Sequence, residues 1–155
     1  MPNETNNTLI IRGDNTAVEN FILLHKLDIN DHLYWDFNKS IPVEEKKYIE
    51  KWGTYRIGIL NLLDKKNGIV MFQTPITPCL KWFEKIVEKY PDLNFSYYYS
   101  DEYQEEFYGW SVGIDGKILD GKQICLHVNK NVGGVDLYKY NDGEKHLQTI
   151  RENYF

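Results

Sequence analysis

The sequence feature that most constrains the fold is a tight turn between two strand-like runs. The turn, Asp64-Lys65-Lys66-Asn67-Gly68, contains an Asn-Gly step, and this step supplies at little cost the positive φ angles that a hairpin turn requires. Tyr55–Leu63 before the turn and Ile69–Thr74 after it are rich in apolar and β-branched residues, which is typical of strands. We therefore predict an antiparallel hairpin near the centre of the chain.

An amphipathic helix is predicted on each side of this hairpin. Ala17–Leu27 follows the capping residues Asp14-Asn15-Thr16, and Pro78–Tyr90 follows Thr77, with proline at its first position. The helical spacing directs a set of apolar residues toward the core; these are Val18, Phe21, Ile22 and Leu24 in the first helix and Leu80, Phe83, Ile86, Val87 and Tyr90 in the second. We expect the second set to pack on a sheet that contains the strand Leu9–Ile11.

Further elements are predicted around these two helices. Strand-like runs occur at Leu9–Ile11, Asn94–Tyr99, Phe107–Ile114, Lys117–Leu119 and Gln123–Asn129. The aromatic stretch Asp28–Ser40 is predicted to be a loop, and Val43–Lys51 and Glu144–Asn153 are predicted to be short helices.

The order strand, helix, hairpin, helix, strand is that of a ferredoxin-like β-α-β-β-α-β unit. We predict an α+β fold with this core, a largely antiparallel sheet, helices on one face, and C-terminal strands with a short helix. The 155 residues fit a single domain spanning 1–155 and can bury a core without help from metal or disulfides.

Charge and cysteine content narrow the classes of function. A formal net charge of −5 repels nucleic-acid phosphates and favours a partner with a basic surface. Cys79 and Cys125 lack the spacing of a metal site or a disulfide framework, and no motif indicates a cofactor. Met1–Thr8 is polar, unlike a signal peptide, and no run approaches the roughly 18 apolar residues that cross a bilayer. We expect a cytoplasmic protein.

Several short motifs resemble those of the YubB-type ferredoxin-like domains. The resemblance is carried by Asn7-Thr8-Leu9-Ile10-Ile11-Arg12-Gly13 (N-x-L-x-I-x-G), Trp52-Gly53-Thr54 (W-G-T), Phe72-Gln73-Thr74 with Pro78 (F-x-T-x-W-x-P-P), Pro91-Asp92-Leu93, Tyr99-x-x-Glu102 and Phe107-Tyr108-Gly109. The chain differs at Ile76 and Thr77, which replace the tryptophan and first proline of the third motif, and at Glu4-Thr5, which replaces Trp-Cys.

The resemblance covers about residues 2–116 and leaves 117–155 as a C-terminal extension packed on that domain. Members of the family occur on phages, plasmids and other mobile elements, so the resemblance implies a mobile-element origin together with the ferredoxin-like fold. It implies no established activity and supplies no catalytic residues.

The densest group of carboxylates lies on the acidic loop 100–106. Its acidic residues and the aromatic residues around them are Asp101, Glu102, Tyr103, Glu105, Glu106, Tyr108 and Trp110. Paired carboxylates can bind Mg²⁺ or Ca²⁺, but the residue order of a calcium-binding loop is missing. Such a loop can also be a solvated hairpin tip, or it can attract a basic partner that the aromatic residues then anchor. We predict the last of these roles and no metal.

A second candidate contact region is Trp52-Gly53-Thr54-Tyr55-Arg56. Tryptophan and arginine are favoured anchors at interfaces, so Trp52, Tyr55 and Arg56 are predicted to line a binding groove. The alternative is structural, because a Trp-Gly step before a strand also suits a tight turn with the indole over the core edge.

Residues that could support catalysis show no catalytic arrangement. His25, His32, His127 and His146 share no metal-ligand spacing. Cys125 lies two residues before His127 in a strand-like run and faces the same side, but no third group or oxyanion donor accompanies the pair. Gly133-Gly134 alone does not make a phosphate loop. We predict no catalytic residues.

We therefore expect a non-catalytic binding protein of a mobile element that docks on another protein or on a nucleoprotein complex in the host cytoplasm. An inhibitor of host defence, similar in action to a CRISPR inhibitor, is one form of this role. One alternative is a nucleic-acid or nucleotide-binding module that stacks bases on Tyr97, Tyr98 or Tyr99. A metal-dependent enzyme built on the acidic loop is the other.

Overall fold

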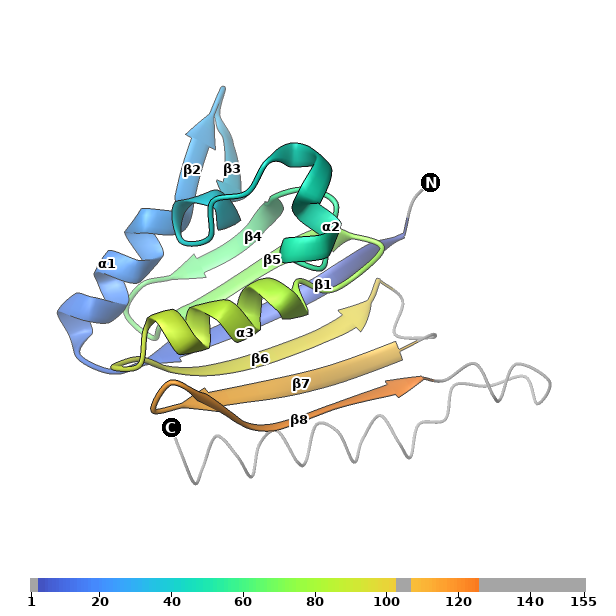
Figure 1. The fold of residues 1–155 in the computed structure, drawn as a ribbon. Coiled ribbons are helices and arrows are strands. Elements are labelled where there is room, and N and C mark those ends of the chain that lie inside the picture. The colour runs from blue at the N-terminus through green and yellow to red at the C-terminus, as the bar shows by residue number, and fades with distance from the viewer. Residues whose placement is uncertain (1–2, 103–106, 126–155) are drawn as a thin grey trace.

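The structure, a computed structural model, describes residues 3–102 and 107–125 (Figure 1). The strands are β1 (Glu4–Arg12), β2 (Lys26–Ile29), β3 (His32–Trp35), β4 (Gly58–Asp64), β5 (Ile69–Pro75), β6 (Asn94–Asp101), β7 (Phe107–Ile114) and β8 (Lys117–Cys125). The helices are α1 (Asn15–His25), α2 (Tyr48–Lys51) and α3 (Leu80–Lys89), with 3-10 turns η1 (Phe37–Lys39) and η2 (Glu45–Lys47).

The eight strands of the described residues belong to one sheet in the order β2-β3-β4-β5-β1-β6-β7-β8, and every neighbouring pair is antiparallel. α1, α2 and α3 lie on one face of this sheet, as predicted (Figure 1). The chain contains more than the predicted core, because β2, β3, η1, η2 and α2 intervene between α1 and β4, and β7 and β8 extend the sheet beyond β6. None of the described helices has the length and apolar character needed to span a bilayer.

The central hairpin is confirmed, with β4 and β5 joined by the predicted turn. Gly68 has a φ of 64°, and a Cβ atom there would lie 2.3 Å from the carbonyl oxygen of Ile11. The amide of Ile11 donates to the carbonyl of Gly68 at 2.7 Å. Glycine is therefore required both for the turn geometry and for the close approach of β1.

α1 is capped as predicted, since the side chain of Asp14 accepts a hydrogen bond from the amide of Ala17 at 3.1 Å. The helix ends at His25 and not at Leu27, because Lys26 adopts an extended backbone that starts β2. His25 is fully buried at the C-terminal end of the core face, whereas Leu24 is exposed. The prediction that Leu24 faces the core is therefore wrong.

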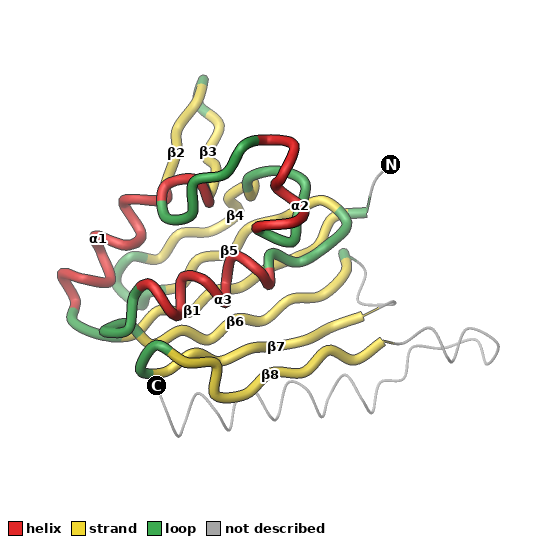
Figure 2. The backbone as a smooth tube through the Cα atoms, viewed as in Figure 1, coloured by secondary structure: helices red, strands yellow, loops and turns green. Residues whose placement is uncertain are grey.

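The predicted loop Asp28–Ser40 contains a hairpin instead. β2 and β3 pair from Lys26–Trp35 to Ile29–His32, and the two residues between them, Asn30 and Asp31, have φ angles of 50° and 65°. Asparagine and aspartate tolerate this left-handed conformation, which a two-residue hairpin turn requires. The hairpin projects beyond the rest of the sheet (Figures 1 and 2).

α3 starts at Leu80, and the prediction that Thr77 caps it is wrong. The Thr77 hydroxyl instead donates to the carbonyl of Gly53 at 2.7 Å. The N-cap residue is Cys79, whose amide donates to the hydroxyl oxygen of Tyr97 at 3.1 Å. A tyrosine of β6 therefore receives the helix-start hydrogen bond that the sequence assigned to the local threonine.

The core between the helices and the sheet confirms the predicted packing of α3. Phe83, Ile86 and Val87 are buried in the same cluster as Leu9 and Ile11 of β1. A smaller cluster, Tyr108, Trp110 and Val112, forms on β7. The sheet therefore supports two separate groups of buried apolar side chains.

Two shorter predicted elements differ from the structure. The predicted helix Val43–Lys51 is divided into η2 and the single turn α2. Residues 117–119 of one predicted run and 123–125 of the other are parts of a single strand, β8, which pairs with β7 and has a register shift opposite Val112 and Gly113. Residues 126–129, Gly133-Gly134 and the predicted helix Glu144–Asn153 lie outside the described residues.

Candidate functional site

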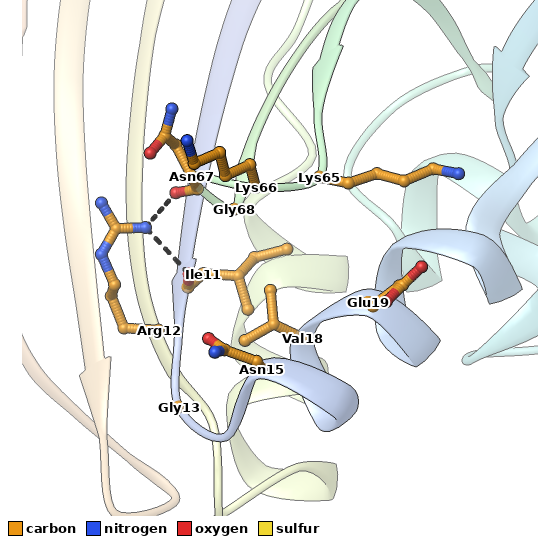
Figure 3. Close-up of a pocket in the computed structure, with 10 residues that line it drawn as sticks. All are labelled: Ile11, Arg12, Gly13, Asn15, Val18, Glu19, Lys65, Lys66, Asn67 and Gly68. Atoms are coloured by element: carbon orange, nitrogen blue, oxygen red, sulfur yellow. Dashed lines mark hydrogen bonds between the residues drawn. The ribbon is translucent and has the colours of Figure 1, made fainter.

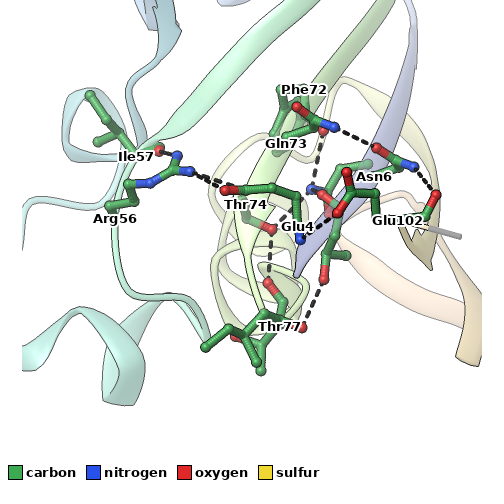
Figure 4. Close-up of polar contacts among 12 residues, drawn as sticks. Glu4, Asn6, Arg56, Ile57, Phe72, Gln73, Thr74, Thr77 and Glu102 are labelled. Atoms are coloured by element: carbon green, nitrogen blue, oxygen red, sulfur yellow. Dashed lines mark hydrogen bonds and ion pairs between the residues drawn. The ribbon is translucent and has the colours of Figure 1, made fainter. Parts of the chain in front are cut away.

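Two regions that the sequence predicted separately are joined at one end of the sheet by Glu4, at the start of β1 (Figure 4). Nη2 of Arg56 donates to both carboxylate oxygens of Glu4, at 2.9 and 3.0 Å. The amide of Glu4 in turn lies 3.4 Å from a carboxylate oxygen of Glu102 and donates to it. Arg56 and Glu102 are thus brought together through a residue that no sequence motif singled out.

Amide side chains continue this polar arrangement along β1 (Figure 4). Nε2 of Gln73 donates to Oδ1 of Asn6 at 3.0 Å, and Nδ2 of Asn6 donates to the carbonyl of Glu102 at 3.5 Å. Asn6 stands between Gln73 of β5 and Ser100 of β6 in the ladder. The contacts therefore tie the ends of three neighbouring strands together.

Ile76, directly after β5, has a backbone conformation that a β-branched residue rarely adopts. Its φ is 65°, and 52% of the residue is exposed. Its amide donates to the carbonyl of Asn3 at 2.8 Å, and its carbonyl accepts from the Thr5 hydroxyl at 2.9 Å. These two hydrogen bonds to the start of β1 hold the backbone of Ile76 in a strained conformation, while its side chain remains in solvent.

The residue before Arg56 in the chain is an exposed aromatic one. Tyr55 precedes Arg56 in the chain and is 54% exposed. We use the name end surface for the group formed by Glu4, Tyr55, Arg56, Ile76 and Glu102. It combines two accessible apolar side chains with two carboxylates and one guanidinium.

Trp52 does not belong to this surface. It is fully buried, its Nε1 donates to the carbonyl of Ile41 at 2.9 Å, and its ring stacks on Tyr48 with centroids 4.1 Å apart. This is the placement expected from the structural alternative, and it leaves none of the indole accessible to a ligand.

The aromatic residues near the acidic loop are also less accessible than predicted. Tyr108 is fully buried and only 5% of Trp110 is exposed, so neither is a surface anchor in this structure. Asp101 is buried as well, and its Oδ1 accepts a hydrogen bond from the amide of Phe107 at 3.1 Å, which fixes the start of β7. Tyr103, Glu105 and Glu106 lie outside the described residues.

The three consecutive tyrosines of β6 divide between the two faces of the sheet. Tyr97 and Tyr99 are buried in the core beneath the helices, with ring centroids 5.3 Å apart. Tyr98 packs with the smaller cluster around Trp110. Most of the predicted base-stacking surface therefore contributes to packing.

The buried groups with catalytic potential have internal partners. Burial lowers the pKa of His25 to about 4, and its two ring nitrogens lie 2.7 Å from the Phe21 carbonyl and 2.8 Å from the Ser40 hydroxyl. Burial raises the pKa of the Cys79 thiol to about 12, so it is not a nucleophile at neutral pH. His127 and His146 lie outside the described residues, and within residues 3–102 and 107–125 no three potential metal ligands gather.

A pocket of about 510 Å³ lies between the start of α1 and the β4–β5 turn (Figure 3). Arg12, Lys65 and Lys66 line it, but Lys65 and Lys66 extend in opposite directions (Figure 3). Nη1 of Arg12 already donates to the carbonyls of Ile11 and Asn67. The cationic groups thus do not converge on one point, as they would in an anion site.

The chain matches the family model of the ferredoxin-like domain in Api92-like protein over residues 48–127. Comparison with curated proteins and with solved structures finds no match. The matched segment runs from α2 to the end of β8 and includes β5 and β6, which both pair with β1. β1 therefore completes the sheet of the matched region from outside it.

The match takes in Arg56, Ile76 and Glu102 of the end surface, while Glu4 lies outside it. It extends over more than half of the 155 residues. The chain therefore belongs to the family of ferredoxin-like domains of Api92-like proteins.

Proposed function

We propose that this chain is a non-catalytic binding protein that docks on another protein, or on a nucleoprotein complex, through the end surface. The observation that carries the proposal is the conformation of Ile76. A left-handed backbone at a β-branched residue costs about 1–3 kcal/mol, and such strain concentrates at functional sites. A side chain that contributed only to the fold would be buried in return, whereas that of Ile76 is exposed.

The charges around Ile76 favour a basic partner. Arg56 compensates one of the two carboxylates in the pair formed by Glu4 and Glu102, so the group keeps a net negative charge. The chain as a whole carries a net charge of −5. A negative surface of this kind increases the association rate with a basic partner, and apolar anchors then lengthen the lifetime of the complex.

The placement of the aromatic residues favours a protein over a single-stranded nucleic acid. Binding to single strands depends on accessible aromatic platforms and a positive groove. Tyr97 and Tyr99 are buried, and the accessible apolar residues of the end surface are a single tyrosine and an isoleucine beside carboxylates. Direct contact with bases is therefore the weaker alternative.

The proposal includes the finer family assignment. β1, α1, β4, β5, α3 and β6 follow the order of a β-α-β-β-α-β unit, and in the sheet the strands lie in the order β4-β5-β1-β6. The resemblance to YubB-type domains supports an origin on a phage or plasmid. The protein would then act in the host cytoplasm, with inhibition of a host defence complex as one form of the activity.

The test is capture of the partner by matched variants of the purified protein. Ile76→Asn removes the apolar side chain and introduces a residue that tolerates the left-handed backbone. Glu102→Lys reverses one charge. Leu119→Asn and Glu88→Lys are the controls, because Leu119 is also 52% exposed and Glu88 is an exposed residue of α3. Proteins retained from host lysate are compared by mass spectrometry, with and without nuclease.

We expect a basic protein to be retained by the wild type and by both controls, and to be lost with Ile76→Asn and Glu102→Lys. The purified candidate should then bind with the same ranking of variants. Equal retention by all five proteins would place the interface elsewhere. Loss of binding after nuclease treatment would favour nucleic-acid recognition.

A further inference from the structure

The strand at one edge of the described sheet, β2, has a sequence that can pair with itself. Among the described residues β2 pairs only with β3, in the register Lys26–Trp35, Leu27–Tyr34, Asp28–Leu33 and Ile29–His32. Lys26 and Asp28 are both exposed. An accessible edge strand is a template for pairing with another strand.

The geometry of the β2–β3 hairpin determines which peptide N–H and C=O groups of β2 face β3 and which face outward. A two-residue turn closes on a hydrogen-bonded pair, here Ile29 and His32, so the peptide groups of Leu27 and Ile29 face β3. Those of Lys26 and Asp28 therefore face outward. Two hydrogen bonds agree with this alternation: the His25 carbonyl accepts from the Asp36 amide on the β3 side, and the Lys26 amide donates to the Ile22 carbonyl of α1.

From this arrangement we infer that the chain forms a homodimer by antiparallel pairing of two β2 strands about a twofold axis at Leu27. In this register Lys26 of each copy lies opposite Asp28 of the other, so two pairs of opposite charge form. The outward amide of each Asp28 donates to the Lys26 carbonyl of the second copy. The two Leu27 residues face each other as a non-hydrogen-bonded pair, in which the side chains are closest.

Apolar side chains near β2 support a second copy as the occupant. Leu23 and Leu24 at the end of α1, and Ile29 and Leu33 in the hairpin, are all exposed large hydrophobic residues. Antiparallel pairing brings the hairpin tip of each copy toward the last turn of α1 in the other. Leucine and isoleucine that are exposed in one chain thus gain apolar neighbours in the dimer.

The twofold axis would be perpendicular to the sheet, so the two described sheets continue into one another with α1, α2 and α3 of both copies on the same face. Each dimer would present two copies of the end surface. If the partner is itself repeated or symmetric, this arrangement raises the effective affinity without any new contact.

The first experiment is sedimentation equilibrium of the full chain over a range of concentrations. The wild type is expected to show a monomer–dimer equilibrium. Asp28→Lys converts both cross-strand pairs into like-charge pairs and should raise the dimer Kd by about tenfold or more. The exchange of both residues, Lys26→Asp with Asp28→Lys, should restore the wild-type Kd, and Glu88→Lys on α3 should leave it unchanged.

The second experiment tests the register by oxidative cross-linking in a Cys125→Ser background. Cα atoms of a non-hydrogen-bonded antiparallel pair lie about 4.5 Å apart, within the range of a disulfide. Leu27→Cys should therefore give a covalent dimer. Ile29→Cys, which is equally close to the edge but lies away from the axis, should not.

Circular dichroism and thermal melts establish that each variant is folded before it is compared. A chain that is monomeric at every concentration overturns the inference. So does a dimer that survives Asp28→Lys unchanged, or cross-linking that favours Ile29→Cys over Leu27→Cys. Recovery of the dimer in the double exchange supports the inference, because the exchange restores charge complementarity while replacing both residues.

Discussion

Nε2 of His25 lies 2.8 Å from the hydroxyl oxygen of Ser40, in the middle of the helix-side core. Nδ1 lies 2.7 Å from the carbonyl of Phe21. Because a carbonyl only accepts, Nδ1 carries the proton and Nε2 accepts from the Ser40 hydroxyl. Ser40 also accepts from Nε1 of Trp82 at 3.0 Å. The neutral imidazole is therefore fully hydrogen-bonded, whereas a protonated ring would require the Ser40 hydroxyl to turn its proton away from Nε2, toward the Phe37 carbonyl at 3.4 Å.

This arrangement predicts a loss of stability in mild acid. Burial, assisted by the charge of Lys89, lowers the pKa of His25 from 6.5 to about 4 in the folded protein. Above pH 6.5 neither state binds the proton; between pH 6.5 and 4 only the unfolded state binds it; below pH 4 both do. The contribution of His25 to the free energy of unfolding should thus fall by about 3 kcal/mol as the pH drops from 6.5 to 4.

Denaturant melts of the wild type and of His25→Gln between pH 7.5 and 4 measure this contribution as the difference in slope, because other groups titrate equally in both proteins. His25→Gln should be less stable at neutral pH and lose less stability in acid. His32→Gln is the control, since His32 is exposed. If His25→Gln kept the full acid dependence, another group would be responsible.

Phe83→Ala should destabilise the protein by about 3–5 kcal/mol, the usual cost of emptying a large core site. The Phe83 ring is fully buried, and its centroid lies 5.0 Å from that of Tyr97 in a stacked geometry. Chemical denaturation measures the loss. Leu24→Ala, at an exposed position of α1, should change stability by no more than about 0.5 kcal/mol. Similar losses for both variants would contradict the assigned core.

Ile76→Gly should stabilise the fold and weaken partner binding. Glycine adopts a φ of 65° without the steric cost of a β-branched residue, which is about 1–3 kcal/mol, although it adds flexibility to the unfolded chain. The net gain should be about 1 kcal/mol in denaturant melts. Ile76→Ala keeps the strain and should give no gain. A destabilised Ile76→Gly variant would show that the side chain supports the fold.

EDTA should leave the melting temperature unchanged. The carboxylates that the sequence grouped in the acidic loop are divided in the structure, because Asp101 is buried against Phe107 whereas Glu102 binds the Glu4 amide. Differential scanning fluorimetry with EDTA, followed by Mg²⁺ or Ca²⁺, measures the effect. A drop of several degrees that one cation reverses would instead favour the metal-dependent alternative.

The sequence predicts best where a local pattern and the tertiary structure agree. The Asn67-Gly68 turn and the apolar face of α3 were both located, because turn chemistry and a strong helical period act over a few residues. The β2–β3 hairpin was missed, since its strands have four residues each and mostly exposed side chains. Its Asn30-Asp31 turn was the signal that could have revealed it.

The candidate site was only partly predictable for a different reason. Arg56 and Glu102 are singled out by residue type, but they are linked only because each contacts Glu4, which is distant from both in the chain. Residue type likewise cannot distinguish a tryptophan at an interface from one in the core, which is where Trp52 lies. The unusual backbone of Ile76 has no sequence signature, because β-branched residues ordinarily avoid it.

The buried side chain of Asn7 has a consequence for how the strands find their alignment. Its Nδ2 donates to the Thr5 and Phe72 carbonyls and to the Thr74 hydroxyl, and its Oδ1 accepts from the hydroxyl of Tyr97. A slip of β1 by one residue would turn the carboxamide to the opposite face and leave buried polar atoms of β5 and β6 without their partners. Apolar side chains alone tolerate small misalignments, whereas this amide is satisfied in a single one. Asn7 thus specifies a single alignment of β1 against β5 and β6.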